Sequence, residues 1–331
     1  MFSTFKHPLW GSHQGAFHEF SPCLAALSAA IAKDSYQRQQ NYRNTLESLG
    51  FESIQMFVDN LQILLARKEV ALSPHDHRTI YALAFRGTDA LADVISDFDF
   101  RLQSFPISEG AAGMDFLVHN GMYVLEQHLE SQAGLISFGQ SENTETLLEV
   151  LEQEEKRNRA LFYLCGHSLG GGIAVLFALR LIEHYGFAPE QIVIYTFGAP
   201  PVASKHLAQR YTGINLRHRG KALTGSRTMY LHRMANIDDP VSGVELQENE
   251  QTHLPRAVIP SLPYATVGLH HIGTELRFCP RLIPEFAKAF QEQMGRVYSN
   301  QKVLDVHCMA GYALGLELTL SAMHKGFKSS K

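Results

Sequence analysis

The segment Gly166-His167-Ser168-Leu169-Gly170 is the feature of this sequence that most restricts its fold. It follows the apolar run 161–165, which is typical of a buried strand, and it precedes the segment 169–184, which reads as a buried helix. A chain that turns from strand to helix at one residue needs very small side chains on both sides of the bend, and Gly166 and Gly170 lie two positions before and after Ser168. The sequence therefore predicts a sharp turn that lifts the Ser168 side chain away from the backbone.

Strand and helix patterns alternate through the rest of the chain. Extended segments are predicted at 54–58, 63–66, 80–85, 161–165, 192–197, 229–234 and near 268–278. Helices are predicted at 22–32, 44–49, 116–129, 146–156, 169–184 and 309–323. Because neighbouring parallel strands need crossover connections, this alternation favours a mainly parallel central sheet with helices on both faces.

A chain of 331 residues is at the upper end of what one decorated α/β domain spans. We expect a single domain over 1–331, with an N-terminal helical segment at 1–50. The polar or proline-containing stretches near 131–143 and 243–263 are predicted to be surface insertions.

Composition removes several classes of function. The 29 basic and 33 acidic side chains give a net charge of -4 without a long block of one sign, so nucleic acid is not expected as a partner. No apolar stretch reaches the roughly 18 to 20 residues of a membrane-spanning helix, and the N-terminus lacks the apolar core of a secretory signal. A cytoplasmic location is the expectation.

The possible metal ligands and thiols are scattered. The four cysteines have no CxxC spacing, which is typical of reduced thiols rather than of a disulfide framework or a zinc site. His75-Asp76-His77 lacks a second group of ligands at a supporting spacing, so a solvated loop is favoured over a metal site. No metal and no cofactor is expected.

Ser168 is the candidate nucleophile. The helix that begins at Leu169 directs unpaired backbone N–H groups and the positive end of its dipole toward the same point, which favours a developing oxyanion. The alternative is that the glycine-rich turn has no chemical role. The adjacent His167 is predicted to support the turn rather than to take part in catalysis.

Four motifs in this order resemble the fungal-type, or class 3, lipase family of the α/β-hydrolase fold. They are Ala84-Phe-Arg-Gly-Thr88, Val118-His-Asn-Gly121, Gly166-His-Ser-Leu-Gly-Gly171 and Thr196-Phe-Gly-Ala-Pro200. The resemblance extends with gaps from about Pro22 to Leu318. It implies an α/β-hydrolase fold with a short helical lid, and it implies hydrolysis of carboxylic esters.

A serine needs an imidazole to take its proton and a carboxylate to orient that imidazole, and in this fold the order is serine, acid, histidine. The segment 229–235 is strand-like and leads to Asp238 and Asp239, of which Asp239 matches the acid of the family's NxxDPVP pattern. The alternative role for Asp239 is to cap backbone groups of a turn. Where the family has the last proline of that pattern, this chain has Ser242.

The catalytic histidine has two candidates. The resemblance assigns the HxGxE pattern at His271 to a structural strand, and it places the base in a DxHxM-like segment, where His307 stands before the last helix. A loop after the last strand can bring an imidazole over the serine, while the pleat fixes the orientation of a histidine inside a strand. His307 is therefore the predicted base, and His271 is the rival.

The resemblance also implies an oxyanion hole and a lid. The backbone N–H of Leu169 and the N–H and hydroxyl of Thr88 are the expected donors, with Asp97 holding Thr88; a strand-end cap is the alternative role for Thr88. The apolar positions Leu91, Val94, Ile95 and Phe98 have helical spacing. This short amphipathic helix occupies the place of the family's lid, and ordinary core packing is its alternative role.

The sequence thus predicts a serine esterase or lipase that acts on acylglycerol-type lipids, or on other esters, at a lipid–water interface. The catalytic residues are Ser168, Asp239 and His307. A phospholipase A1-type hydrolase is the nearest alternative, because pocket shape determines specificity. From another class, the alternative is a catalytically silent hydrolase-fold protein that binds a lipid or a partner.

Overall fold

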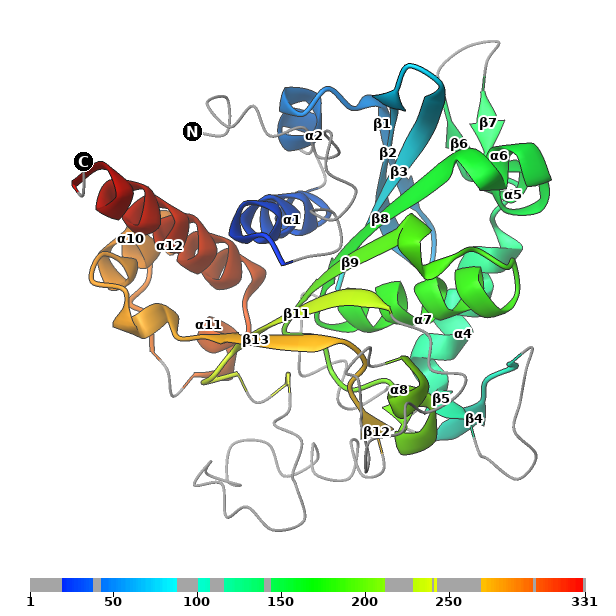
Figure 1. Ribbon diagram of the computed structural model, residues 1–331. Helices are drawn as coiled ribbons and strands as arrows, with labels where there is room; N and C mark the ends of the chain where they lie inside the picture. Colours follow the sequence, from blue (N-terminus) through cyan, green and yellow to red (C-terminus); the bar gives the residue numbers. More distant parts are fainter. Residues whose placement is uncertain are drawn as a thin grey trace, which may run out of the picture.

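The computed structural model describes residues 20–37, 43–87, 101–107, 116–139, 144–211, 229–239, 241–242, 269–299 and 302–329. Its main feature is a seven-stranded sheet in the order β1-β2-β3-β8-β9-β11-β13 (Figure 1). The strands are β1 (Glu52–Val58), β2 (Gln62–Ser73), β3 (Asp76–Phe85), β8 (Ala160–His167), β9 (Ile192–Phe197), β11 (Tyr230–Asn236) and β13 (Thr274–Phe278). The first three are antiparallel, and every pair from β3 to β13 is parallel. The predicted mainly parallel sheet is confirmed.

Two smaller sheets lie among the described residues. One has the order β12-β10-β5-β4, and the other pairs β6 with β7. Their bounds are β4 (Leu102–Ser104), β5 (Leu117–His119), β6 (Ser137–Phe138), β7 (Glu145–Thr146), β10 (Ala203–Ser204) and β12 (Leu269–His270).

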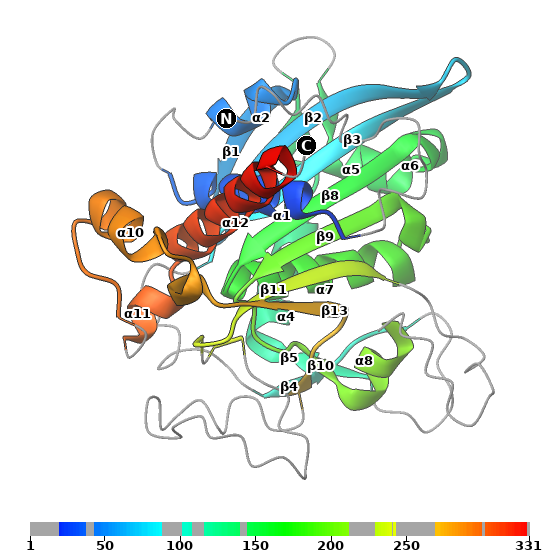
Figure 2. The ribbon, with the colours of Figure 1, turned by 60° about the vertical axis from the view of Figure 1, so that its left-hand side comes forward.

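Helices cover both faces of the central sheet (Figure 2). One face carries α1 (Pro22–Asp34), α2 (Asn44–Ser48) and α12 (Met309–Ser329), and the other carries α4 (Asn120–Ser131), α5 (Leu147–Glu152), α7 (Leu169–Glu183) and α8 (Lys205–Tyr211). The remaining described helices are α6 (Glu154–Arg159), α10 (Phe286–Met294), α11 (Val303–Val306), η3 (Pro189–Gln191) and η4 (Pro280–Leu282). The layer of α1 and α12 joins segments from near the two ends of the described chain.

Alternation along the strands produces two hydrophobic cores. In β3, Leu83 and Phe85 face the core under α4 and α7, while Ala82 and Ala84 face the core under α1 and α12. All eight residues of β8 are buried, so this central strand is apolar on both sides, as parallel strands covered by two helix layers are. Residue 168 therefore follows the carboxyl end of a fully buried strand in the middle of the sheet.

Three predicted elements differ from the structure in their bounds. Residues 117–119 form β5 rather than helix, because Val118 pairs with Ala203 and the helix starts only at Asn120. The helix predicted at 146–156 divides into α5 and α6 at Gln153, whose backbone is extended. The strand predicted near 268–278 divides into β12 and β13 around Gly273, which has a φ of 88°.

The sequence predicts surface insertions near 131–143 and 243–263 and a helical segment at 1–50. Within the stretch near 131–143, Ala133, Ile136 and Phe138 are buried in the α4–α7 core. The stretch at 243–263 lies outside the described residues. The 1–50 segment contributes α1 and α2, as its helical pattern predicts.

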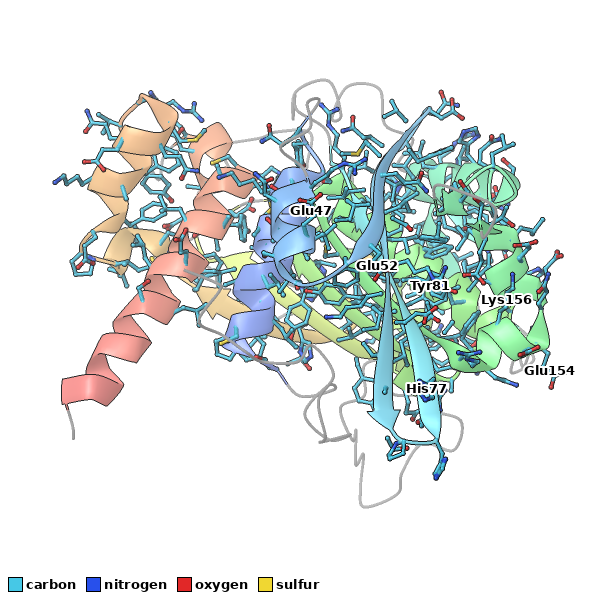
Figure 3. All side chains as sticks on the ribbon, turned by 90° about the horizontal axis from the view of Figure 1, so that it is seen from above. Glu47, Glu52, His77, Tyr81, Glu154 and Lys156 are labelled. Atoms are coloured by element: carbon cyan, nitrogen blue, oxygen red, sulfur yellow. The ribbon has the colours of Figure 1, made fainter. Side chains whose placement is uncertain are left out.

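His75 lies in the tight turn between β2 and β3, and Asp76 and His77 are the first two residues of β3. Asp76 accepts a hydrogen bond from Arg78 Nε at 2.5 Å, and Figure 3 shows His77 at the projecting end of this hairpin. In the part of the chain that the structure describes, no group of three or more His, Cys, Asp or Glu residues could hold a metal ion. Over the same residues, no helix combines the length and apolar character that a membrane span requires.

Candidate active site

Ser168 occupies the bend between β8 and α7. Its φ of 55° and ψ of -128° lie in a backbone region that residues other than glycine rarely adopt. A Cβ on Gly166 would overlap the backbone oxygen of Gly170, and a Cβ on Gly170 would overlap the backbone oxygen of Phe85. Both glycines are therefore required by backbone contacts, as the motif predicts.

The helix that starts at Leu169 faces the same point. Ser168 O accepts hydrogen bonds from Gly171 N at 3.0 Å and Gly172 N at 3.2 Å, so the helical pattern begins at the serine itself. Leu169 is the first residue of α7, and its N–H therefore has no acceptor within the helix. This N–H and the positive end of the helix dipole are available to an anion beside Ser168.

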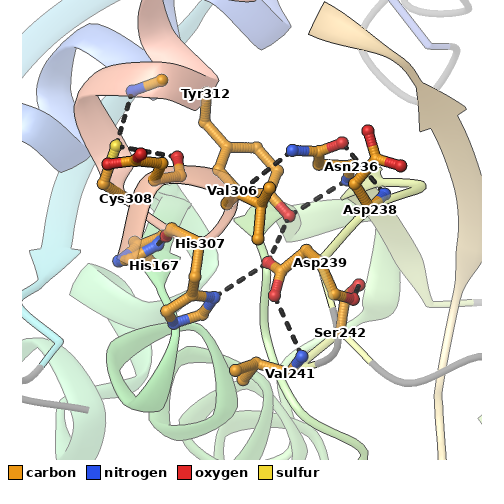
Figure 4. A network of polar contacts seen from close by, with 12 residues as sticks. His167, Asn236, Asp238, Asp239, Val241, Ser242, Val306, His307, Cys308 and Tyr312 are labelled. Atoms are coloured by element: carbon orange, nitrogen blue, oxygen red, sulfur yellow. Dashed lines mark hydrogen bonds and ion pairs between the residues drawn. The ribbon is translucent and has the colours of Figure 1, made fainter. Parts of the chain in front are cut away.

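Asp239 follows β11 and is held from several directions. Its Oδ1 accepts from Val241 N at 2.9 Å, and its Oδ2 accepts from Tyr312 OH at 2.7 Å and from His307 Nδ1 at 2.8 Å (Figure 4). The neighbouring Asp238 instead accepts from Arg281 Nε at 2.8 Å. The structure thus separates the two acids: Asp239 contacts the histidine, and Asp238 pairs with an arginine.

His307 lies between α11 and α12, with its ring directed at Asp239 (Figure 4). Because the carboxylate can only accept, Nδ1 carries the proton, and the neutral ring therefore has an unprotonated Nε2. That Nε2 is buried and makes no hydrogen bond within the described residues. This is the tautomer that a base needs in order to take a proton from a hydroxyl group.

The rival His271 has a different place. Its Nε2 lies 2.6 Å from the carbonyl oxygen of Ser242, whose hydroxyl donates to Asp239 O at 3.0 Å. His271 therefore supports the loop that carries the acid. Glu275, the last residue of the HxGxE pattern, pairs with Arg233 of β11 at 2.6 Å.

Two residues beside the acid–histidine pair have no assigned role in the sequence-based prediction. Tyr312 OH accepts from Asn236 N at 3.0 Å and donates to Asp239, and burial holds its pKa well above the usual value, so this donor stays protonated. A Cβ on Gly198, with φ of 56°, would lie 2.7 Å from Asp239 Oδ2 and 3.1 Å from His307 Nδ1. The TFGAP motif and the tyrosine after His307 were the signals that could have identified them.

His167, next to the serine, is within hydrogen-bond distance of two groups through its ring nitrogens. Its Nδ1 lies 2.7 Å from Tyr36 OH, and its Nε2 lies 2.5 Å from the backbone oxygen of His307. Burial, followed by the neighbouring His307, holds the pKa of His167 well below its usual value. The ring is therefore neutral. Nothing in the sequence pattern around Tyr36 indicates its proximity to this site.

Other predicted site residues fall outside the described part of the chain. Thr88 and Asp97, the expected oxyanion residue and its support, are among them. So is the predicted lid, with Leu91, Val94, Ile95 and Phe98. Gly87 is the last described residue before this segment, and it lies close to the serine: a Cβ built on it would be 3.2 Å from Ser168 Cβ.

Comparisons with known proteins find a family and related sequences. The model of the family described as "Lipase (class 3)" matches residues 82–248. A lipase of Rhizomucor miehei is 28% identical over 199 residues, which cover 60% of this chain and 41% of that protein. The toxin TseL of Vibrio cholerae serotype O1 is 35% identical over 77 residues, covering 23% of this chain and 12% of the toxin. The chain thus spans less than half the length of either relative.

Two solved structures resemble the fold. The Rhizomucor miehei lipase propeptide complex has a TM-score of 0.50 and 19% identity, over 77% of this chain and 67% of that chain. Lipase II from Rhizopus niveus has a TM-score of 0.50 and 18% identity, over 78% of this chain and 80% of that chain. At these identities the likeness concerns the fold alone.

Proposed function

This chain belongs to the class 3 lipase family, a family of carboxylic ester hydrolases, and we propose that it cleaves acylglycerol-type esters through an acyl-enzyme intermediate. One observation carries the proposal. His307 donates from Nδ1 to a buried aspartate, and its Nε2 has no hydrogen-bond partner among the described residues. Its backbone oxygen bonds to His167, the residue directly before Ser168 in the strained turn.

The proposed reaction begins with attack of Ser168 Oγ on the ester carbonyl carbon while His307 Nε2 takes the hydroxyl proton. Asp239 stabilises the resulting imidazolium through Nδ1. The tetrahedral oxygen accepts from Leu169 N–H and, by analogy with the family, from Thr88. Collapse breaks the ester bond, and the departing alkoxide takes the proton from His307.

Water then completes the cycle. His307 Nε2 takes one proton from a water molecule, whose oxygen attacks the acyl carbon. The second collapse releases the carboxylic acid and returns the proton to Ser168. The two hydrogen bonds from Val241 N and Tyr312 OH keep the Asp239 carboxylate oriented during both acylation and deacylation.

The experiment that tests this proposal combines a fluorophosphonate probe with hydrolysis of p-nitrophenyl esters. We expect the wild type to be labelled and active, and Ser168→Ala to show neither property. His307→Ala should lose at least about 1,000-fold in kcat, because removal of the base removes general acid–base catalysis. His271→Ala is the matched control: it removes an imidazole whose Nε2 lies 2.6 Å from the carbonyl oxygen of Ser242 in the acid loop, and it should keep a measurable rate.

Two results would contradict the proposal. Absence of labelling in the folded wild type would favour the silent binding protein, and inactivation by His271→Ala with activity retained in His307→Ala would reverse the assignment of the base. The same assay with acylglycerols and phospholipids, below and above their solubility limits, tests the substrate class. Faster turnover of diacyl phospholipids at the first acyl position would replace the acylglycerol assignment with the phospholipase A1 type.

A further inference from the structure

A second network of hydrogen bonds connects the loop of His307 to the bend at Ser168. His307 is anchored at two points: its ring bonds to Asp239, and its backbone oxygen bonds to His167 Nε2 at 2.5 Å. The second contact is unusual because His167 precedes the nucleophile directly. It therefore connects the loop of the base to the bend that positions Ser168 Oγ.

The hydrogen-bond roles follow from chemistry. A backbone carbonyl can only accept, so His167 Nε2 carries the ring proton. The neutral ring then accepts at Nδ1, and the donor within reach is Tyr36 OH at 2.7 Å. Burial keeps the pKa of His167 low, so this tautomer persists at neutral pH.

Tyr36 is itself held in a defined place at the end of α1. Ser35 O accepts from Gln62 Nε2 at 2.7 Å, and Gln62 Oε1 accepts from Arg86 Nη1 at 2.5 Å. The Arg86 guanidinium lies 5.5 Å from the centre of the Tyr36 ring. The Tyr36 hydroxyl also lies against Gly87, whose added Cβ would overlap it.

From this geometry we infer that Tyr36 and His167 are positioning residues for the reaction, acting as a brace that sets the distance between His307 Nε2 and Ser168 Oγ. The Tyr36 hydroxyl fixes the tautomer and the angle of the His167 ring. The ring then fixes the backbone of His307. This inference rests on the proposed function, and it makes the N-terminal helix a functional part of the site.

The expected effect is on turnover rather than on substrate binding. Neither Tyr36 nor His167 takes a proton from the substrate, and a displacement of about 1 Å between reacting groups can lower a rate by as much as 100-fold. Tyr36→Phe keeps the ring beside Arg86 and removes only the hydroxyl. We expect it to lower kcat about tenfold with KM unchanged within twofold.

A double-mutant cycle with a soluble short-chain p-nitrophenyl ester tests the inference. If Tyr36 acts through His167, Tyr36→Phe should change kcat less than twofold in a His167→Ala background. His167→Gln, which keeps an N–H donor, should retain more activity than His167→Ala. Tyr195→Phe is the matched control. It removes a buried hydroxyl that accepts a hydrogen bond from Ser21 N and lies on the same face of the sheet as Tyr36. Its kcat should equal that of the wild type.

Several outcomes would overturn the brace. The first is an unchanged kcat in Tyr36→Phe. The second is a kcat that Tyr36→Phe lowers by the same factor in the wild-type and His167→Ala backgrounds. The third is a raised KM with unchanged kcat. The proposed function fails separately, when Ser168→Ala remains labelled or active. Unfolding midpoints of the variants, measured in parallel, show whether a loss of activity follows from a loss of folded protein.

Discussion

At the scale of single residues, the site depends on a backbone conformation that its central residue does not favour. Ser168 has a positive φ and a ψ far from the left-handed helical region, where a residue with a Cβ is strained by about 1 to 3 kcal/mol. The glycines around it remove clashes with neighbouring backbone, but they do not relieve this torsional strain. The strain is the consequence of presenting a side chain at the tip of the bend.

This strain predicts different stabilities for two inactive variants. Ser168→Ala keeps a Cβ and therefore the strain, while Ser168→Gly relieves it. Glycine also raises the conformational entropy of the unfolded chain, but this destabilising effect is smaller than the strain that is relieved. We expect Ser168→Gly to have the higher free energy of unfolding, by about 1 kcal/mol. Urea denaturation followed by circular dichroism measures the difference. Equal stabilities, or a less stable glycine variant, would contradict it.

Sequence reasoning succeeds at this scale where the signal is local. The bend and its two glycines follow from one short segment, whereas the choice of Asp239 over Asp238 comes from the resemblance to the family's NxxDPVP pattern. Tyr36 lies 131 residues before His167, and no periodicity or spacing relates them. Only the packing of α1 against the sheet brings the tyrosine to the site.

At the scale of elements, the last turn of α1 carries an unfavourable carboxylate. Asp34 ends the helix, where the negative end of the dipole repels a negative charge. Its Oδ2 is buried without a hydrogen bond among the described residues. Burial raises the pKa of Asp34 from 3.8 to about 6, although a hydrogen bond from Thr45 and the charge of Lys33 oppose the shift.

This pKa predicts how stability changes with pH. Between pH of about 4 and 6 the folded state keeps the Asp34 proton while the unfolded chain releases it, so the free energy of unfolding falls as the pH rises through that window. Asp34→Asn removes the charge. It should stabilise the protein on the order of 1 to 2 kcal/mol at pH 8, and the gain should vanish near pH 3.5.

Thermal or urea unfolding at several pH values measures this dependence. Glu154→Gln is the control, because Glu154 is exposed on α6 (Figure 3) and its removal should leave the pH dependence unchanged. A pH-independent effect of Asp34→Asn would show that the gain does not come from the ionisation.

The bounds of elements show where local patterns are insufficient. A helical pattern spans 146–156, but Thr146 and Glu149 form a capping box at the start of α5, and the extended backbone of Gln153 ends that helix. Residues 117–119 also fit a helix by pattern. They form a strand because Val118 meets Ala203, a pairing across 85 residues that only the folded chain creates.

At the scale of the whole molecule, the serine and the histidine depend on different helix layers. Ser168 directly precedes α7, which packs in the core with α4, while His307 precedes α12, which packs beside α1 on the opposite face of the sheet (Figures 1 and 2). The alternation of strands and helices predicted these layers. Which layer carries the base follows only from the structure.

This division predicts that weakening of the α1–α12 layer removes activity before the sheet unfolds. Leu316 of α12 is 6% exposed and Leu181 of α7 is fully buried, each in one of the two cores. Truncation of either leucine to alanine should lower stability by about 2 to 5 kcal/mol. In Leu316→Ala, however, α12 can separate from α1 and carry His307 away from Asp239 while the sheet and α7 remain folded.

The measurement follows ester hydrolysis and far-ultraviolet circular dichroism in the same urea series. For Leu316→Ala we expect activity to be lost at a lower urea concentration than the main loss of secondary structure, whereas for Leu181→Ala the two midpoints should coincide. Coincident midpoints in both variants would mean that the two layers unfold as one cooperative unit. The separate midpoints are expected because turnover depends, in the proposed mechanism, on the hydrogen bond between His307 and Asp239, and its two partners lie on segments that only tertiary packing holds together.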